Sequence, residues 1–599
     1  MTIYDYIVIG FYLVFMLVMG PVYKSFSKTA SDYFRCGGGM LWWVVGSSAF
    51  MTTFSAWSFT GGAAKAYETG TFFLLLFLCN FAGLWFTYFF TAARFRQMRI
   101  VTAIEAVRKR FGNVNEQVFT WLPIPFNIVF GGLSLYSISV FMYSVFGINM
   151  VALIVGLGIT VMVMTLVGGA WAATAGDFVQ MLVVVTITVL MAFLTLTHPD
   201  IGGAVELVNK LPPHHFNWTL FDRPWIIAFF AVTLLINQMV QNNSMLLGAA
   251  KYVFVKNGAD AKKATLISIV GFLLLSPIWM IPAVAATILH PNLAAEYPRL
   301  NNPNEAAYVA MAVTLLPQGL LGLLVCAIFA ASLTTMNSLL NIAAGTFVRN
   351  FYIRIIDKTA SESRQIFIGR VFIFAYVICW ILMAMLFMNF KELKLFDLLL
   401  ICAASIQIPI TVPLFFGIFI KRTPAWTGWS TMAAGFSVSL LLRFVLTPDF
   451  FGRVLKTDTP FSKQELGDLN IAATTAVLFV VCIAWFFFTT LFYKKDKKAY
   501  VEQVDAFFEE MSTPIDMAVE HGSTYDSDSR QYGVLGILCL IYGAFILLLL
   551  LIPNSSQARM GILFCGGTIF LAGAILQWIS RKLRRKNNTL LPAEADAAG

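Results

Sequence analysis

Long apolar segments recur throughout this chain of 599 residues, and they constrain its fold more than any other feature. A helix needs about 20 mainly apolar residues to cross the hydrocarbon core of a bilayer, and about fifteen segments meet that requirement. They lie near residues 4–22, 40–66, 70–93, 117–146, 149–168, 174–197, 224–248, 264–289, 319–345, 368–389, 395–420, 426–446, 470–493, 533–553 and 558–580. Only 12% of the residues are charged, against about 25% in soluble domains. We therefore predict an all-α polytopic protein in a lipid bilayer.

The positive charges are unevenly divided between the two sides of this arrangement. About 30 of the 41 Lys and Arg residues fall in loops on one side, and the positive-inside rule makes that side cytoplasmic. An odd number of spans then places the N-terminus outside and the C-terminus inside the cell (inner or plasma) membrane. The net charge of +10 follows from this bias, so we expect no nucleic-acid partner. No pattern in the sequence indicates an obligate protein partner.

One apolar segment, Val325 to Asn341, carries an unusual number of polar side chains. In lipid each hydroxyl or amide needs a hydrogen-bond partner. Thr334, Thr335 and Ser338 fall at positions i, i+1 and i+4 and project to one side of a helix. Hydroxyl oxygens grouped in this way suit Na⁺. The alternative is that small polar residues allow two helices to pack closely, and this segment alone does not decide between the two.

The second apolar segment is expected to contain a broken helix. Its centre is rich in hydroxyl side chains, those of Thr52, Thr53, Ser55 and Ser58. Gly61 and Gly62 follow, and hydroxyls followed by a glycine pair are what a break in a membrane helix requires. Carbonyl groups freed at such a break can hold a cation at membrane depth. The alternative is a kinked, tightly packed helix.

Three further polar features interrupt apolar segments. Asp5 lies near the outer end of the first segment, where we expect it at the membrane interface. Asp177 lies at or just inside the cytoplasmic boundary of the sixth segment, and it is either an interface anchor or a cation ligand. Residues 237–244 carry five amides and a hydroxyl, which suits a solute site or an inner gate.

Catalytic motifs are missing from the sequence. It has no phosphate-binding loop, no nucleotide motif and no order of Ser, His and Asp typical of hydrolases. The eight Cys residues show neither a disulfide framework nor a zinc-binding spacing. We therefore expect a protein that is not an enzyme and uses no organic cofactor.

Several motifs in register resemble those of the sodium:solute symporter family, which includes the sodium/proline, pantothenate, sialic acid and glucose symporters. Residues 31–46, SDYFRCGGGMLWWVVG, look like the family's entry to its first core helix. Residues 168–180, GGAWAATAGDFVQ, resemble its G-G-x-x-A-x-x-x-T-D-x-x-Q motif. Residues 331–341, ASLTTMNSLLN, are similar to its A-x-x-S-[ST]-L-x-S-x-L-N motif. The resemblance extends over about residues 4–490, most of the chain.

The resemblance implies a leucine-transporter-type fold, in which two inverted five-helix repeats cross at a central site built from discontinuous helices. The first helix and the helices after the second repeat are then additions to this core. The expected division is a first helix and loop at 1–39, repeat one at 40–197, an external loop at 198–222, repeat two at 223–420, two peripheral helices at 421–493, a cytoplasmic segment at 494–532, a helical hairpin at 533–580 and a basic tail at 581–599.

The resemblance also implies a sodium site between the second and ninth segments. Its ligands, by motif register, are the carbonyl groups of Met51, Phe54 and Ala331 and the hydroxyls of Thr334 and Thr335. The coupling ion is therefore expected to be Na⁺.

Some members of the family carry a second sodium site. The matching positions are Asp177, Thr334, Thr335, Asn337 and Ser338. Gly176 and Asn337 depart from the residues of those members, although an Asn still offers a carbonyl oxygen. The sequence therefore leaves one and two Na⁺ ions per transport cycle equally open.

Solute ligands in this family come from the broken helices and the neighbouring core. The matching positions are Thr53, Trp57, Ser58, Asn237, Gln238, Gln241 and Gln407. The Gln that sugar transporters have at the position of Ser58, and their Lys near the position of Leu273, are both missing. Residues 55–57, SAW, are similar to the S-G-W of the sodium/proline symporters. We therefore expect an amino acid such as proline, or a carboxylate, ahead of a sugar.

Together these features predict a sodium-coupled secondary active symporter that imports a small organic solute by alternating access. Na⁺ would hold the broken helix in shape and so preorganise the solute pocket. By linkage the solute would raise the affinity for Na⁺ by the same factor. The alternative is a membrane receptor or sensor built on the same scaffold, although 494–532 and 581–599 are too short to hold a kinase.

Overall fold

The structure is a computed structural model of the chain, and nearly all of its described part is helical. It describes residues 2–23, 26, 36–216, 224–246, 249–298, 300, 302–389, 400, 403–445, 450, 454, 461, 463–493, 497–515 and 525–596. Of the predicted motifs, the first part of residues 31–46 lies outside the described residues. The all-α fold class is confirmed.

The helices follow one another in the order that the apolar segments predict. In the first half they are α1 (Ile3–Tyr23), α3 (Trp42–Thr53), α4 (Ala63–Thr69), α5 (Leu74–Phe86), α6 (Ala92–Gln97), α7 (Ala103–Phe111), α8 (Asn113–Trp121), α9 (Pro123–Phe146), α10 (Met150–Thr197) and α11 (Ala204–Lys210). In the second half they are α12 (Pro224–Asn242), α13 (Ala249–Tyr252), α14 (Gly258–Leu289), α15 (Leu293–Glu296), α16 (Ala307–Leu315), α17 (Leu320–Thr346), α18 (Glu362–Met388), α20 (Ile408–Phe419), α21 (Thr427–Val445), α23 (Lys463–Thr490), α24 (Lys498–Ser512), α26 (Tyr525–Leu548) and α27 (Ser556–Asp596). Short π-helical stretches include η3 (Ser58–Gly62), η8 (Phe347–Ile356) and η9 (Ala403–Gln407).

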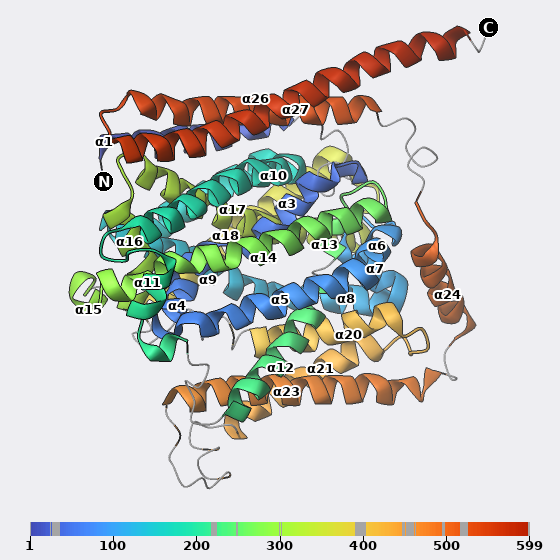
Figure 1. Cartoon of the computed structure of the whole chain (residues 1–599). Coiled ribbons are helices and arrows are strands. Elements are labelled where there is room, and N and C mark those ends of the chain that lie inside the picture. Colours follow the sequence, from blue (N-terminus) through green and yellow to red (C-terminus); the bar gives the residue numbers. More distant parts are fainter. Residues whose placement is uncertain are drawn as a thin grey trace.

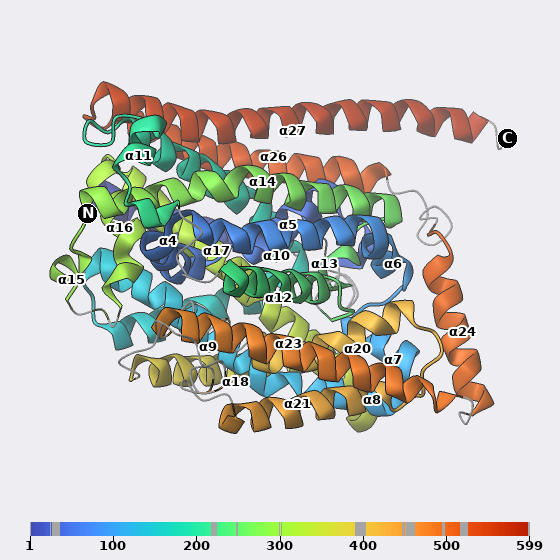
Figure 2. The same cartoon turned by 60° about the horizontal axis from the view of Figure 1, so that its bottom comes forward.

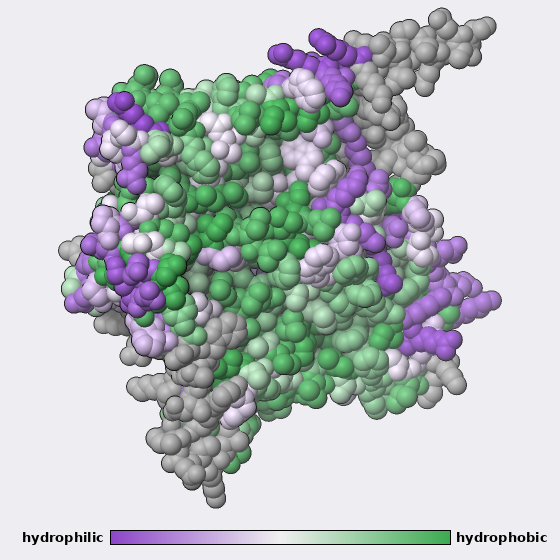
Figure 3. Space-filling view, in the orientation of Figure 1, coloured by the Kyte–Doolittle hydropathy of each residue, from purple (hydrophilic) through white to green (hydrophobic). Residues whose placement is uncertain are grey.

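The surface of the molecule is that of a membrane protein. Among the described residues, 11 helical stretches are long and apolar enough to cross a bilayer, and two shorter ones are apolar as well. Figure 3 shows the apolar surface as a band between two polar ends, and the helices in Figure 1 run across that band. The total of about fifteen membrane helices and the division into repeats remain predictions.

The helices added to the core lie on two opposite flanks. Figures 1 and 2 show the hairpin of α26 and α27 on one flank and α21 with α23 on the other. The hairpin packs against α1, where the rings of Phe11 and Phe545 stack with their centroids 3.6 Å apart. The central helices, α17 among them, lie between these flanks.

Helix α17 is the most enclosed of the membrane helices. Of its most apolar stretch, 94% is buried inside the protein, against 67% or less for each of the others that could span a bilayer. Polar side chains on α17 therefore face other helices rather than lipid, which satisfies the requirement that buried polar groups find partners. This enclosure makes α17 the central element of the fold.

Asp5 anchors the beginning of α17. We expected this residue at the membrane interface, a depth that remains a prediction, and its side chain is buried against α17. Its Oδ1 accepts the backbone N–H groups of Gly319 and Gly322, each at 2.9 Å. The first N–H groups of a helix lack partners within that helix, and a carboxylate there is also favoured by the helix dipole. Asp5 therefore caps α17 from a separate helix.

The predicted break in the second segment is present, but not at the glycine pair. Helix α3 ends at Thr53, and Phe54 adopts an extended conformation with φ −95° and ψ 128°. Gly61 and Gly62 lie in the π-helical stretch η3 instead. A Cβ on Gly62 would lie 3.2 Å from the ring of Phe73, so this glycine serves close packing rather than the break.

Two predicted segments, 149–168 and 174–197, are joined in the single helix α10. A straight helix of its 48 residues would be about 72 Å long, more than twice the thickness of a bilayer core. Its apolar residues fall into two stretches, Met150–Leu166 and Ala170–Thr197. The second stretch packs against α17 and carries Asp177.

A buried arginine ties together the loops at one polar end. The guanidinium of Arg110, in α7, donates from Nε to the Gly417 carbonyl at 2.9 Å and from a terminal nitrogen to the Ile420 carbonyl at 2.6 Å. Its other terminal nitrogen donates to the Tyr500 hydroxyl of α24 at 3.1 Å. One side chain thus joins α7, the end of α20 and α24.

Candidate functional site

The break in α3 lies against the middle of α17. The N–H of Phe54 donates to the Met51 carbonyl at 3.1 Å instead of continuing the α-helical pattern. From α17, the Thr335 hydroxyl donates to the Thr52 carbonyl at 3.2 Å, and the Ala331 carbonyl lies 3.4 Å from the same hydroxyl. The contact therefore brings Ala331 and Thr335 of α17 to the break that contains Met51 and Phe54, and the assembly of these four expected ligands into one sodium site remains a prediction.

Ser332 holds the other half of the broken helix. Its Oγ accepts the N–H of Ala56 at 2.8 Å and donates to the Ile328 carbonyl at 3.0 Å. The helix resumes at Ala56, where N–H groups have no helical partners. A hydroxyl of α17 therefore caps the second half-helix, as an N-cap side chain does within one helix. The sequence analysis gave Ser332 no role.

The contact between α3 and α17 offers neutral oxygen atoms to a cation. These are the carbonyl oxygens at the break and on α17, together with the Thr335 hydroxyl. A hard cation prefers oxygen ligands of this kind. None of the four expected ligands at this contact carries a charged side chain, so a cation bound here would supply the only charge of that group.

Thr334, the fifth expected ligand, faces a different group of side chains. Its hydroxyl donates toward Asp177 Oδ1 at 2.7 Å and lies 2.8 Å from Gln180 Oε1, both on α10. Neighbouring residues of a helix point about 100° apart, so Thr334 and Thr335 serve two different faces of α17.

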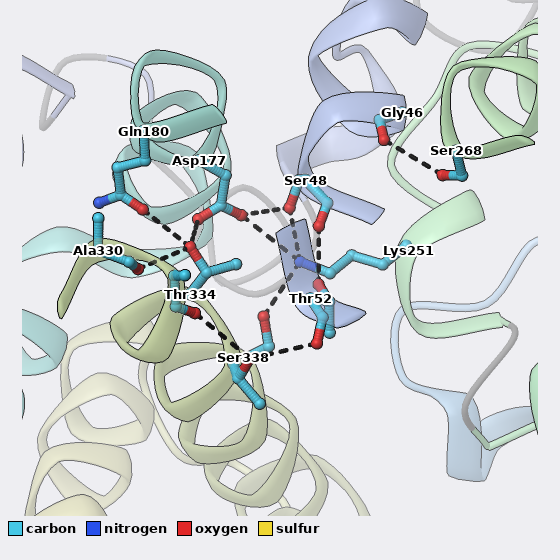
Figure 4. A network of polar contacts seen from close by, with 12 residues as sticks. Gly46, Ser48, Thr52, Asp177, Gln180, Lys251, Ser268, Ala330, Thr334 and Ser338 are labelled. Atoms are coloured by element: carbon cyan, nitrogen blue, oxygen red, sulfur yellow. Dashed lines mark hydrogen bonds and ion pairs between the residues drawn. The ribbon is translucent and has the colours of Figure 1, made fainter. Parts of the chain in front are cut away.

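The second face of α17 contains an ion pair (Figure 4). Lys251 Nζ lies 3.7 Å from Asp177 Oδ2. It also donates to the hydroxyls of Ser48, on α3, at 2.7 Å and of Ser338, on α17, at 3.1 Å. The Ser48 hydroxyl in turn donates to Asp177 Oδ2. Four segments of the chain thus contribute side chains to one charged cluster.

This cluster contains only part of the expected second sodium site. Asp177, Thr334 and Ser338 belong to it. The Asn337 Oδ1 instead accepts the hydroxyl of Thr165 at 2.5 Å, and Thr335 faces the break in α3. Two of the five expected ligands therefore make their hydrogen bonds elsewhere.

The chain after α13 fixes the position of Lys251. The N–H of Met40 donates to the Phe254 carbonyl at 3.0 Å, and Met40 pairs with Val255 in a parallel bridge. Lys251 lies outside the stretches that could span a membrane, but its side chain is largely buried. Burial lowers the pKa of its ammonium below the ordinary value, and the Asp177 carboxylate acts in the opposite direction.

A cavity of about 50 Å³ adjoins the cluster. Lys251 and Ser338 line it together with Thr102, Asn341 and Thr346, and most of its remaining lining is apolar. A cavity of this volume has room for a few water molecules. Lys251 therefore borders a small space of mixed polarity formed by residues of α10, α17, the chain after α13 and the loop before α7.

Two of the expected solute ligands follow the break in α3. Trp57 lies beside Phe73, with ring centroids 6.5 Å apart, and Ser58 is buried at the start of η3. The side chain of Thr53 lies outside the described residues. This part of the broken helix is surrounded by aromatic rings, among them that of Trp279.

The other expected solute ligands lie on α12 and η9. The Gln241 amide donates to Asn237 Oδ1 at 2.8 Å, so these two side chains bond to each other on α12. Gln238 is on the same helix, and Gln407 ends η9 before α20. These side chains lie on other elements than Trp57 and Ser58, and their assembly into one pocket remains a prediction.

Two neighbouring amides have a structural role. Asn242 donates to Asn80 Oδ1 at 3.1 Å. Asn243 donates to the Gly83 carbonyl at 3.2 Å and accepts the Thr91 hydroxyl at 2.5 Å. These amides join α12 to α5 and the stretch that follows it. Part of the amide cluster therefore holds helices together by hydrogen bonds, a common role of polar residues in membrane helices, rather than facing a solute site.

Comparison with known proteins identifies the family. The model of the sodium:solute symporter family matches residues 33–435, about two thirds of the chain. The chain belongs to this family. It is therefore a multi-pass membrane transporter that couples solute movement to Na⁺, and not an enzyme. The predicted family, coupling ion and lack of enzymatic activity are confirmed.

The similar curated proteins are sodium symporters of several solutes. The chain is 24% identical over 458 residues to a sodium/sialic acid symporter of Aliivibrio fischeri, which covers 75% of this chain and 89% of the relative. It is 25% identical to a sodium/sialic acid symporter of Proteus mirabilis, covering 75% and 91%. It is 26% identical to the human sodium/myo-inositol cotransporter 2, covering 80% and 76%. The receptor alternative finds no support among these relatives.

Solved structures confirm the fold. A Na⁺-coupled sialic acid symporter in a substrate-bound, outward-open state aligns with a TM-score of 0.63 at 20% identity, over 81% of this chain and 98% of the other. A transporter of the nucleobase-cation-symport-1 family in a closed conformation aligns with a TM-score of 0.51 at 12% identity, over 80% and 99%. The leucine-transporter-type architecture is therefore confirmed.

Proposed function

We propose that this symporter imports a sugar-type solute that carries a carboxylate, of which sialic acid is the example, together with Na⁺. The observation that carries the proposal is the break in α3 at Phe54, which faces Ala331 and Thr335 of the enclosed helix α17. Such a break supplies carbonyl oxygens for a cation and a half-helix N-terminus for an anionic group.

The proposed sodium site consists of the carbonyl groups of Met51, Phe54 and Ala331 with the hydroxyl of Thr335. Thr334, the fifth ligand that the motif register implies, faces Asp177 in this structure. Because these ligands come from both α3 and α17, a bound ion draws the two helices together. It thereby fixes the orientation of the half-helix that begins at Ala56 and is capped by α17.

The solute class is inferred from two independent arguments. The first is the similarity to sialic acid and myo-inositol symporters, which favours a polyhydroxylated solute over the amino acid that residues 55–57 alone suggest. The second is the half-helix N-terminus, which favours a carboxylate. Leu273 lies near the position at which sugar transporters have a Lys, and its apolar side chain is 53% exposed on the surface of the protein. A neutral sugar would therefore lack the hydrogen bond that such a Lys can donate.

The proposed solute ligands are the residues derived above. They are Thr53, Trp57, Ser58, Asn237, Gln238, Gln241 and Gln407. Trp57 and Ser58 directly follow the break, so they are the members of this set that a bound Na⁺ would position. The amides on α12 and η9 would complete the pocket from the second repeat.

We propose that the solute and Na⁺ move into the cell. In this orientation the N-terminus lies outside the membrane. The polar end that contains α7 and α24 is rich in basic residues, which supports its cytoplasmic assignment. One charge moving down a potential of about 100 mV supplies about 2.3 kcal/mol, or roughly a 50-fold accumulation of solute. Alternating access on the scaffold of the two repeats would use this energy.

The test is uptake by proteoliposomes that contain the purified protein. Labelled sialic acid, myo-inositol, glucose and proline are compared with an inward Na⁺ gradient and with K⁺ in its place. We expect Na⁺-stimulated uptake of sialic acid that exceeds the uptake of the other three solutes. Stimulated uptake of proline alone would overturn the solute class, and no stimulation with a wide set of metabolites would overturn the proposed transport.

A further inference from the structure

The ammonium of Lys251 lies where a second sodium ion was expected. Its Nζ donates to the hydroxyls of Ser48 and Ser338 and lies 3.7 Å from Asp177 Oδ2 (Figure 4). Asp177 and Ser338 are two of the expected ligands of that ion. An ammonium has three N–H donors, of which two donate to these hydroxyls while the charge pairs with Asp177. The residues present therefore fit an ammonium, which bonds to the oxygens that a second Na⁺ would need.

The position of Lys251 is built into the fold. Its side chain is 13% exposed and that of Asp177 is 4% exposed. The backbone a few residues later pairs with Met40, at the entry to α3. The Arg96 guanidinium donates to the Val255 carbonyl at 2.5 Å and holds the same stretch. Lys251 thus reaches the cluster from an anchored segment.

The charges of the cluster balance without an added ion. Asp177 contributes one negative charge and Lys251 one positive charge. The other members described above, Ser48, Thr334, Ser338 and Gln180, are neutral and bond directly to this pair or to each other. A buried carboxylate needs one cation close by, and this one already has it.

The ligands that a second sodium ion would need are also incomplete. The Asn337 oxygen accepts the hydroxyl of Thr165 rather than facing the cluster. Gly176, beside Asp177, offers no side-chain oxygen. A Cβ built on Gly176 would meet its nearest neighbours only at 3.7 Å or more, so packing does not exclude a larger residue. Both observations agree with a cluster that does not bind Na⁺.

We infer that Lys251 serves as a permanent internal cation at the second cation site, so that transport is coupled to one Na⁺ rather than two. This inference rests on the proposed sodium symport and specifies its stoichiometry. The tethered ammonium stabilises Asp177 and keeps α3, α10 and α17 together in every state in which the pair is intact. Sodium coupling then depends only on the site at the break of α3.

The test counts the Na⁺ ions bound by the purified full-length protein. Equilibrium binding of radioactive Na⁺ is measured at constant ionic strength for the wild type, Lys251→Met, Lys251→Arg and the double variant Asp177→Asn/Lys251→Met. The matched control is Lys256→Met, since Lys256 forms an ion pair with Asp528 away from α17. The thermal unfolding midpoint is followed across the same Na⁺ titration.

We expect one bound ion in the wild type, in Lys251→Arg, in Lys256→Met and in the double variant. We expect two in Lys251→Met, because the Asp177 carboxylate then has no ammonium beside it and recruits Na⁺ as its counter-charge. In that variant Na⁺ should also raise the unfolding midpoint more than it does in the wild type.

Two results would overturn the inference. They are two ions bound by the wild type, and one ion bound by both the wild type and a folded Lys251→Met. If Lys251→Met does not fold, the counts for the wild type and the double variant decide, since two ions in either contradict the proposal. A wild type that binds no Na⁺ would instead overturn the sodium site of the proposed function.

Discussion

On one face of α17, Ala331 and Thr335 lie against the break in α3, and the ligands that we propose for Na⁺ there are neutral oxygens. On the adjacent face, Thr334 and Ser338 lie against a carboxylate and an ammonium that neutralise each other. The two faces belong to one helix and are only about 100° apart. They differ in where the positive charge comes from.

The difference explains how one buried helix serves both coupling and stability. A group of neutral oxygens gains a cation only from solution, so its occupancy follows the Na⁺ concentration. A cluster with its own ammonium does not respond to Na⁺. Placing a second unit charge about 4 Å from Lys251 Nζ would cost about 4 kcal/mol at an effective dielectric constant of about 20, roughly a thousandfold in affinity.

The largest expected effect comes from removing the carboxylate of the charged face. Asp177→Asn leaves the Lys251 ammonium buried without its counter-charge, and breaking a buried pair costs about 3–5 kcal/mol. We expect a loss of stability of that order in denaturant unfolding in detergent. The double variant Asp177→Asn/Lys251→Met removes both charges and should regain most of the loss.

The matched control for this pair lies between the start of α14 and the start of α26. Lys256 and Asp528 form a more exposed ion pair, with side chains 15% and 22% exposed. Asp528→Asn should cost less than Asp177→Asn, because the Asp528 carboxylate is 22% exposed and its attraction to the lysine is more screened by water than that of Asp177, which is 4% exposed. Equal losses at the two positions would show that the cluster on α17 is not specially dependent on its charge balance.

The next effect concerns the neutral face. Thr335→Ala removes a hydroxyl from the proposed sodium site, and we expect the Na⁺ concentration for half-maximal uptake to rise about tenfold, which corresponds to about 1.4 kcal/mol. Thr334→Ala should raise it less, because that hydroxyl faces Asp177. The control is Thr195→Ala, whose hydroxyl donates to the Met191 carbonyl of its own helix. A larger effect for Thr334→Ala would reverse our assignment of the two faces.

A smaller effect is expected at the cap of the broken helix. Ser332→Ala leaves the N–H of Ala56 without its partner, and loss of an N-cap costs about 1 kcal/mol. Half of the broken helix becomes less well fixed, so the Na⁺ dependence of uptake should shift severalfold. Ser332→Thr retains a hydroxyl and should behave more like the wild type. An unchanged Na⁺ dependence in Ser332→Ala would show that the hydrogen bond between Ser332 and the N–H of Ala56 has no influence on Na⁺ binding.

The smallest effect on coupling is expected at Asp5. Asp5→Ala removes the cap from the beginning of α17 and should lower the unfolding free energy by about 1 kcal/mol. The half-maximal Na⁺ concentration should not change, because the cap lies far along α17 from Thr335. A shift in Na⁺ dependence as large as that of Thr335→Ala would mean that the whole helix, and not one face of it, determines ion binding.

Much of this arrangement could be predicted from the sequence, since it depends on residue type and spacing. The apolar segments predicted the helices, and the hydroxyls near Thr52 predicted the break in α3. The position of the break could not be inferred from Gly61 and Gly62, because these glycines serve close packing near Phe73. Backbone geometry at Phe54 depends instead on contacts with α17.

The residues that the sequence did not reveal are those whose partners are distant along the chain. Lys251 lies 74 positions from Asp177, and nothing in its neighbourhood shows that it turns inward. A lysine shortly after the amides of 237–244 was the available signal, but loop lysines are normally solvated. Ser332 and Asp5 were also missed, because caps supplied by another helix leave no local pattern.

The number of Na⁺ ions that move with each solute molecule shows whether Lys251 takes the place of a second ion. The direct measurement is the ratio of radioactive Na⁺ influx to labelled solute influx in proteoliposomes held at a fixed membrane potential. We predict a ratio of one for the wild type, with the ion at the break of α3 as the coupled ion. A ratio of two with Lys251 intact would contradict the account.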